Sequence, residues 1–404
     1  MPTSSKKRKN ELAALLKKPL LFFPFILVFF EVINYLSNDM YLPALPALTK
    51  DFNISMHTAQ MTLTVWFLGT ASMQLFLGPL SDRIGRRPVV LGGGLVFIGS
   101  TFYCAFTPHI YFFLLARYLQ GCAVCAIGTA GYSAIHVCFE QRDAIYLLAI
   151  MGSITILSPA FGPLAGSILL YWLSWPWTFG VLGILAVIGW ILLWRWMPES
   201  NPAGKSHRLP WHKIGQNYSA IFFTPRFTLN MLILCCISLT IIAWIATGPF
   251  LVVDKFKFNT WYFSLFQILI FSSLMLGAQI VRHFAKKIDL QLLINTGLFF
   301  VLIGGGLAFI LAALLPQFLY GLIFSLMLLT FGFSLMFGPL QRIAIEACIE
   351  PMGARMAVLS SLLSWFSFMG GMLVTISYDG SLLWMGKLLL GAAILACILR
   401  FFTR

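Results

Sequence analysis

The chain of 404 residues is 59% hydrophobic and only 10% charged, whereas ordinary soluble domains carry about 25% charged residues. This composition excludes a soluble architecture and predicts a single membrane-embedded unit. The formal net charge of +14 would suit a nucleic-acid partner, but the basic residues stand between apolar runs and not on one folded face. We therefore predict no nucleic-acid partner.

Apolar stretches of helix length predict about twelve membrane-spanning helices, since each crossing needs about 20 apolar residues. None of these stretches alternates with the period of a lipid-facing strand. The expected fold class is therefore an all-α membrane protein. In chain order the predicted spans cover residues 20–42, 58–80, 88–107, 110–134, 144–170, 173–197, 227–252, 260–283, 289–314, 317–341, 354–377 and 382–402.

Lysine and arginine residues are unevenly divided between the two sides of these spans. One side receives most of them, in the N-terminal tail, in the loop after the second span and in the connection after the sixth. The opposite side receives Lys50, Lys255 and Lys257. Because basic loops stay in the cytoplasm, the sequence predicts a multi-pass protein of the inner (cytoplasmic) membrane with both termini cytoplasmic.

A polar stretch divides the chain nearly in half. The predicted domains are an N-terminal six-helix half at 1–197, a cytoplasmic linker at 198–226 and a C-terminal six-helix half at 227–404. Gly78 precedes a cluster of arginines, and in a weak internal repeat Gly277 precedes Arg282, Lys286 and Lys287. Paired halves are a transporter architecture, with the substrate site between them near the membrane midplane. We expect a monomer in the lipid bilayer.

The eight cysteines lie in or at the ends of predicted spans, so they cannot form an extracellular disulfide framework. Cys122 and Cys125 form a C-x-x-C pattern, but without a second thiol pair or a nearby histidine pair they are interpreted as packing residues. No metal site and no cofactor are predicted. The chain also presents no serine or cysteine with an evident base, so we do not expect an enzyme.

Acidic residues inside the hydrocarbon region are functional candidates because they are costly to bury. Glu31 and Asp39 both lie in the first span, and their spacing on a helix corresponds to about 12 Å of rise and roughly 80° of rotation. Both side chains can thus face one cavity. Because burial disfavours an ionised carboxyl group, each can exchange a proton in competition with a substrate. The alternative for Asp39, close to Pro43, is a solvated residue at the helix end.

Arg117 lies inside the fourth span, where its guanidinium stays protonated and needs carboxylate or carbonyl partners. It can therefore help an acid to release its proton, or simply bind backbone carbonyl groups. Arg342, near Glu346 at the end of the tenth span, can instead reach the cytoplasmic interface. Gln267 and Asn38 are polar residues in apolar spans, and they suit either helix–helix hydrogen bonds or substrate contacts.

The strongest local pattern is GPLSDRIGRRP, from Gly78 to Pro88, which we interpret as a conformational-switch loop. Its glycines allow a tight turn, and its arginines hold the loop at the cytoplasmic surface. Its acid can pair with them or with a facing helix N-terminus, and this contact would break when the halves move. The residues predicted to act in the switch are Gly78, Asp82, Arg83, Gly85, Arg86 and Arg87.

These patterns resemble the motifs of the major facilitator superfamily. The loop resembles the family signature between its second and third helices, and the segment around Arg117 is similar to a second family motif. Residues 158–167 resemble the antiporter motif, whose small residues let helices pack closely and bend. Here Ala149, Ser158 and Ser167 stand where glycines are usual. The antiporter motif residues are Ser158, Pro159, Gly162, Pro163 and Gly166.

Within the family, the first helix with Glu31 and Asp39 resembles the multidrug/proton antiporters, and residues 41–46 resemble the Bcr/CflA exporters. The resemblance implies twelve helices in two six-helix halves. It also implies that Glu31 and Asp39 are the proton and substrate carboxylates, and with the buried Arg117 they are the residues predicted to couple transport to protons. The substrate-binding residues that it implies are Tyr35, Asn38, Asp39, Tyr132 and Gln267.

The expected function is a proton-coupled secondary transporter, an antiporter that exports small lipophilic, drug-like compounds by alternating access. A dedicated exporter of an endogenous metabolite such as a siderophore is the alternative, because Arg117 and Arg342 would suit an anionic cargo. Uptake by symport would use the same fold.

Overall fold

The computed structural model describes residues 22–155, 157–200, 210–284 and 289–403. This part of the chain is almost entirely helical and contains no strand, which confirms the predicted all-α fold. Its first helices are α2 (Phe22–Asp39), η2 (Leu42–Ala44), α3 (Leu45–Asp51), α4 (Met56–Ile84), α5 (Arg86–Phe106), α6 (Ile110–Ala126), η3 (Ile127–Gly131), α7 (Tyr132–Cys138), α8 (Gln141–Thr155), α9 (Ser158–Trp172) and α10 (Pro176–Trp196). The rest are α11 (Trp211–Phe222), α12 (Pro225–Pro249), η4 (Phe250–Lys255), α13 (Thr260–Phe284), α14 (Leu290–Leu314), α15 (Leu319–Glu346), α16 (Met352–Ser377) and α17 (Leu382–Phe401).

Some predicted features lie outside the described residues. They are the basic N-terminal tail, part of the linker at 201–209, Lys286, Lys287 and Arg404.

The predicted membrane spans correspond closely to long helices. Within the described chain, eleven helices are long and apolar enough to cross a membrane. The fifth predicted span, 144–170, is divided between α8 and α9, each of 15 residues. Pro159 stands at the second position of α9, where its missing N–H group cannot bond to the preceding turn. The fifth predicted crossing therefore consists of two short helices.

The turn between the second and third spans is shorter than predicted. α4 continues to Ile84 and α5 begins at Arg86, so only Gly85 separates the two helices. Gly85 has a φ angle of 103°, a conformation that glycine adopts without steric cost. We refer to residues 82–87 as the α4–α5 joint. Most of the predicted switch loop is thus part of the two helices, which meet in a sharp turn at Gly85.

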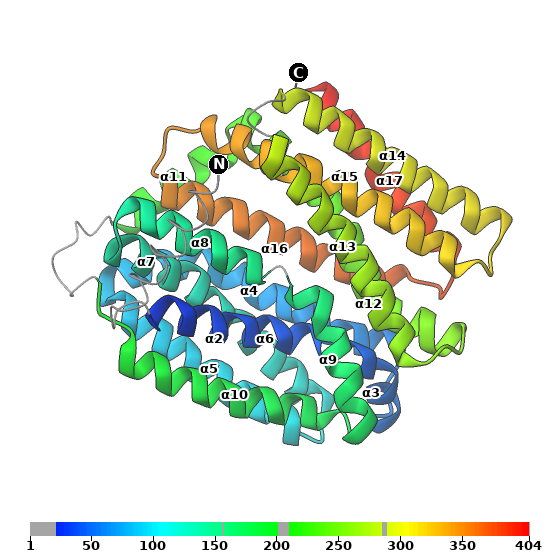
Figure 1. Cartoon of the computed structure of the whole chain (residues 1–404), viewed down its shortest axis with the longest axis horizontal. Helices are drawn as coiled ribbons and strands as arrows, with labels where there is room; N and C mark the ends of the chain where they lie inside the picture. Colours follow the sequence, from blue (N-terminus) through cyan, green and yellow to red (C-terminus); the bar gives the residue numbers. More distant parts are fainter. Residues whose placement is uncertain (1–21, 156, 201–209, 285–288, 404) are drawn as a thin grey trace, which may run out of the picture.

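Two helical bundles lie side by side (Figure 1), one formed by α2 to α10 and the other by α12 to α17. Between them, α4 packs along α16 and α9 packs along α13. One apolar cluster, which includes Phe30 and Phe97, belongs to the first bundle alone. The other cluster joins Tyr41 and Phe113 of the first bundle to Trp244 of the second. Apolar packing therefore connects the two bundles directly.

The bundles meet closely at the end of the molecule that carries α3, on the right in Figure 1. There η2 contacts α12 and α13, and α3 contacts η4. The hydroxyl groups of Ser167 on α9 and Ser264 on α13 are 2.8 Å apart, and Ser264 Oγ donates to the carbonyl oxygen of Pro163 at 2.8 Å. These contacts close the space between the bundles at the α3 end.

The opposite end carries the linker helix α11, on the left in Figure 1. α11 packs against α16, and its Tyr218 hydroxyl donates to the carbonyl oxygen of Leu75 on α4 at 3.0 Å. Burial, and then the nearby Asp82 carboxylate, raises the pKa of Tyr218 to about 12. The hydroxyl therefore keeps its proton at physiological pH, and α11 stays connected to both bundles.

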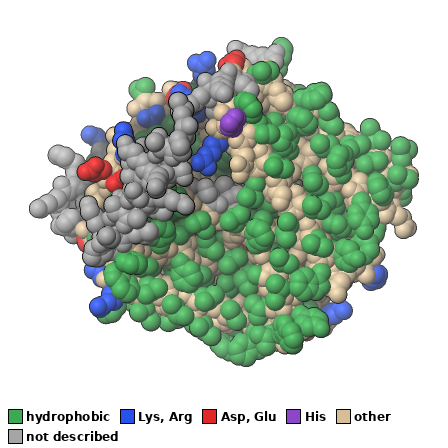
Figure 2. Space-filling model, viewed as in Figure 1, with side chains coloured by type: hydrophobic (Ala, Val, Ile, Leu, Met, Phe, Trp, Pro, Cys, Tyr) green, Lys and Arg blue, Asp and Glu red, His purple; other side chains and the backbone are tan. Residues whose placement is uncertain are grey.

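Hydrophobic side chains cover wide areas of the outer surface in Figure 2. Large apolar residues such as Trp194 on α10 and Phe299 on α14 are exposed. Contiguous apolar surface of this extent marks contact with a membrane or a partner. Together with the eleven candidate spans, it embeds the described part of the chain in a lipid bilayer.

Candidate substrate and proton site

The two acids of α2 are both buried, Glu31 at 3% exposure and Asp39 at 5%. Asp39 is the last residue of α2, and Pro43 follows four residues later within η2. Because proline cannot donate to the carbonyl group four residues earlier, the helix ends at Asp39. Asp39 lies at a helix end, as the alternative prediction held, but it is buried and not solvated.

Glu31 is bound by Tyr132, whose hydroxyl donates to both carboxylate oxygens at 2.9 Å. Tyr132 opens α7, directly after the π-helical segment η3. Such π segments change the helical register and are frequent at functional sites. Leu27 packs on Gly131, where an added Cβ would lie 2.9 Å from its side chain. The structure therefore brings together two of the predicted residues, Glu31 and Tyr132.

Asp39 is held by the predicted antiporter motif on α9. A Cβ added at Gly162 would lie 2.6 Å from the Cβ of Asp39. A Cβ added at Gly166 would collide with the carbonyl oxygen of Met40. Only glycine permits this approach of α9 to the end of α2. The motif thus fixes the backbone that carries the candidate carboxylate.

Both serines that replace the usual glycines lie in α9. Ser167 makes the inter-bundle hydrogen bond with Ser264. Ser158, at the start of α9, is buried close to the Asp39 carboxyl group. The departure at Ser167 therefore adds a polar contact between the bundles, a role that the motif alone does not suggest.

Arg117 is completely buried and makes four hydrogen bonds. Its guanidinium donates to the Ser37 carbonyl oxygen at 2.9 Å and to Asn38 Oδ1 at 2.8 Å. It also donates to the Thr62 carbonyl oxygen at 3.1 Å and to Gln120 Oε1 at 2.7 Å. These bonds connect α6 to α4 and to the last turn of α2.

The Arg117 guanidinium and the Asp39 carboxylate are neighbours that do not form an ion pair, because none of their nitrogen–oxygen distances is 4.0 Å or less. The guanidinium instead lies 4.5 Å from the Tyr41 ring centroid, a favourable cation–π contact. Arg117 thus binds the two residues before Asp39 and leaves the carboxylate outside its hydrogen bonds. The bonds to backbone carbonyl groups match one of the two roles predicted for Arg117. Its place beside Asp39 is compatible with the other role, help in releasing the proton of an acid, which stays a prediction.

The remaining predicted pocket residues occupy different positions. The centroid of the Tyr35 ring lies 6.4 Å from that of the Trp66 ring. The side-chain oxygen of Asn38 accepts its hydrogen bond from Arg117. Gln267 on α13 accepts a hydrogen bond from Trp244 Nε1 at 2.9 Å, within the second bundle. Its amide nitrogen is buried with no hydrogen-bond partner. A contact of Gln267 with a substrate stays a prediction.

Glu199 is a candidate residue of the α4–α5 joint that the sequence did not indicate. Its carboxylate oxygens accept hydrogen bonds from the backbone N–H groups of Arg86 and Arg87, both at 3.2 Å. Carboxylates stabilise helix N-termini in this way. Asp82 instead pairs with Arg86 at 3.8 Å. The pairing of Asp82 with an arginine of the loop is one of the two contacts expected of it, and Glu199 supplies a carboxylate at the N-terminus of α5.

The α4–α5 joint is also tied to the linker. Arg83 stacks on the Trp211 ring of α11, 4.3 Å from its centroid, and the Arg86 guanidinium donates to the Ser133 carbonyl oxygen at 3.0 Å. The α4–α5 joint therefore contacts three other parts of the chain. They are α7, the linker helix α11, and Glu199 just after α10. No local pattern indicates these pairings, because the partners are more than 40 positions apart.

Replacing Gly166 with alanine is expected to lower both stability and transport, since the new methyl group collides with backbone at Met40. Overpacking of this kind costs about 1–3 kcal/mol. Thermal unfolding of the purified protein and export by cells would measure the effect. The matched control is Gly99→Ala on α5, where nothing lies within 4 Å of an added Cβ. Equal unfolding temperatures for the two variants would contradict the close packing.

Comparison with known proteins gives relatives over most of the chain. The chloramphenicol resistance protein CraA of Acinetobacter baumannii is 32% identical over 380 residues, covering 94% of this chain and 91% of that protein. The multidrug transporter MdfA of Escherichia coli is 33% identical over 298 residues, covering 73% of this chain and 72% of that protein. These relatives are transporters and not enzymes.

A solved structure has the same fold. It is the crystal structure of a bacterial homologue of the human lysosomal transporter Spinster, in an inward-facing and unoccupied conformation. It matches with a TM-score of 0.70 and 13% sequence identity, and the match covers 96% of each chain. The family model of the Major Facilitator Superfamily matches residues 27–375, a range that includes both acids of α2, the α4–α5 joint, Arg117 and α9. The chain therefore belongs to the Major Facilitator Superfamily, as its motifs predicted.

Proposed function

We propose that this chain is a proton-coupled antiporter that exports lipophilic, drug-like compounds by alternating access. The observation that carries the proposal is the buried pair of carboxyl groups on α2, Glu31 and Asp39. The relatives named for chloramphenicol resistance and multidrug transport support drugs as the cargo.

Asp39 is the candidate for the competition between proton and substrate. A buried carboxylate is stable only when a proton or a counter-charge compensates it, and Asp39 forms no ion pair with the adjacent Arg117. A proton entering from one side or a substrate entering from the other can therefore supply the compensation, and binding of one disfavours binding of the other.

Glu31 is suited to a second proton-binding step. The Tyr132 hydroxyl donates to its carboxylate when Glu31 is ionised, and the same hydroxyl oxygen can accept a hydrogen bond when Glu31 is protonated. Tyr132 thus remains a partner in both states. Because it stands at the end of the π segment η3, small changes in that segment alter how well Glu31 holds its proton.

The arrangement of the bundles supports alternating access. The contacts between Ser167, Ser264 and Pro163 close the α3 end, and the uneven distribution of basic residues predicts that the α11 end is cytoplasmic. In this proposal the structure is the state closed toward the cell exterior. Export then requires these contacts to separate while the bundles approach at the α11 end.

The arginines that would favour an anionic cargo already have partners. Arg117 makes four hydrogen bonds, and Arg342 pairs with Glu346 at 2.7 Å on the exposed end of α15. This disfavours the dedicated exporter of an anionic metabolite and favours a neutral or cationic lipophilic substrate.

The experiment that tests the proposal is substrate-induced proton release by the purified protein in weakly buffered detergent. Chloramphenicol, a lipophilic cation and a lipophilic anion are added in turn at constant pH. We expect protons to be released with the cation or with chloramphenicol and not with the anion. A protein that binds these compounds without any pH change would contradict antiport, and proton release with the anion alone would favour the metabolite exporter.

A further inference from the structure

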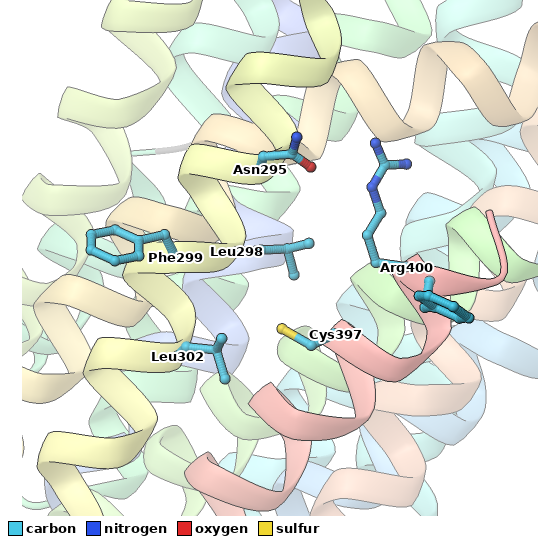
Figure 3. Close-up of a pocket in the computed structure, with 7 residues that line it drawn as sticks. Asn295, Leu298, Phe299, Leu302, Cys397 and Arg400 are labelled. Atoms are coloured by element: carbon cyan, nitrogen blue, oxygen red, sulfur yellow. The ribbon is translucent and has the colours of Figure 1, made fainter. Parts of the chain in front are cut away.

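A groove opens on the outer surface of the second bundle, between α14 and α17 (Figure 3). Its volume is about 330 Å³, and its lining residues are Asn295, Leu298, Phe299, Leu302, Cys397, Arg400 and Phe401. α14 and α17 pack extensively against each other and against α12 and α15 of the same bundle. The groove is therefore separate from the candidate site on α2.

The lining is divided by chemistry along the groove. Arg400 and Asn295 lie at its upper end in Figure 3, and Leu302 lies below. From Asn295 to Leu302 the helix rises by about 10 Å. One end of the groove is thus lined by a guanidinium cation and an amide, and the rest is lined by hydrocarbon side chains and one thiol. A molecule with an anionic head and an apolar tail matches this order.

The cation is held in place by the protein. The Arg400 guanidinium donates to Gln291 Oε1 and, at 3.2 Å, to Thr403 Oγ1. Its side chain is only 5% exposed, unlike an arginine that simply extends into water. In contrast, the apolar residues at the rim are open, with Phe299 58% exposed and Phe401 76% exposed.

The position of the groove across the membrane also fits a lipid. Arg400 is the penultimate residue of the last helix and Asn295 is near the start of α14, so both lie close to the α11 end, the predicted cytoplasmic side. Basic pockets between membrane helices on that side bind anionic lipid headgroups. We infer that this groove binds one anionic phospholipid of the cytoplasmic leaflet, with its phosphate at Arg400 and an acyl chain along Leu298, Phe299 and Leu302.

Cys397 lies inside the groove and provides a local probe. In a variant that keeps Cys397 as its only cysteine, the rate of N-ethylmaleimide labelling is measured in nanodiscs of dioleoylphosphatidylglycerol and of dioleoylphosphatidylcholine. We expect labelling to be about fivefold slower in phosphatidylglycerol, the effect of one arginine on an anionic headgroup. Arg400→Gln should remove the difference, Arg400→Lys should keep most of it, and Arg195→Gln on α10 should leave it unchanged.

Other outcomes would overturn the inference. Equal labelling rates in the two lipids would exclude selection of an anionic headgroup. Protection by soluble glycerol phosphate in phosphatidylcholine nanodiscs would identify a free anion as the ligand, and protection that rises with protein concentration would identify a second copy of the chain. If the single-cysteine variant does not fold, native mass spectrometry of the wild-type protein and Arg400→Gln replaces it. Retention of the same number of phosphatidylglycerol molecules by both would then contradict the site.

Discussion

Replacing Asp39 with asparagine is expected to abolish export driven by a pH gradient while leaving the fold intact. Asparagine has nearly the same shape, so the contact with Gly162 and the end of α2 are preserved. It cannot bind or release a proton, and without that exchange a proton and a substrate no longer compete at this position. The measurement is uptake of chloramphenicol or a lipophilic cation into inverted vesicles, together with proton release in detergent.

The matched control for Asp39→Asn is Asp289→Asn. Asp289 accepts from the Gln291 backbone N–H at the start of α14, and asparagine serves equally well at that position. This variant should transport as the wild-type protein does. Gradient-driven transport at the wild-type rate by Asp39→Asn would show that Asp39 is not a coupling residue. Loss of transport with a large fall in unfolding temperature would assign it a structural role.

Replacing Arg117 with lysine is expected to destabilise the protein and to stop transport, although the charge is retained. Lysine is a point charge and cannot reproduce the planar set of bonds to Ser37, Asn38, Thr62 and Gln120. Buried acceptors left without donors cost about 1–3 kcal/mol each. With two of them lost, we expect the unfolding temperature to fall by about 2–7 °C.

Thermal unfolding and vesicle transport, measured on the same preparations, test this prediction. Arg195→Lys is the control, because Arg195 is exposed at the end of α10 and stacks on the neighbouring Trp196 at 5.5 Å. Exposed cations contribute little to stability, so this variant should unfold at the wild-type temperature. An Arg117→Lys protein that unfolds and transports like the wild type would mean that its four hydrogen bonds are dispensable.

The fold was predictable from the sequence because each membrane span is specified locally by its own apolar residues. The division of the fifth span at α8 and α9 and the π segment before Tyr132 were not predicted. Both are departures from regular helix geometry within apolar sequence, and they depend on packing against α2. Hydropathy reports that a segment crosses the membrane and does not report where its helix is interrupted.

The candidate site was predictable to the extent that buried charges are rare in such a chain. Glu31, Asp39 and Arg117 were selected for that reason, and all three are buried. Their partners were harder to predict, because a pairing such as Glu199 with Arg86 joins residues 113 positions apart. Glu199 is the only acid of the polar linker at 198–226, but hydropathy places it outside the membrane, so burial cost did not single it out.

The contact of Glu199 with the N-terminus of α5 changes how the protein should be divided for separate expression of its halves. Hydropathy ends the first half at residue 197. A fragment ending there would leave the backbone N–H groups of Arg86 and Arg87 without their carboxylate, and Arg86 would also lose its bond to Ser200 Oγ at 3.4 Å. A first fragment that extends through Ser200 includes every one of these partners. We therefore expect a first fragment that ends at Ser200 to be more stable than one that ends at residue 197, because α5 and α10 pack together and Glu199 binds the start of α5.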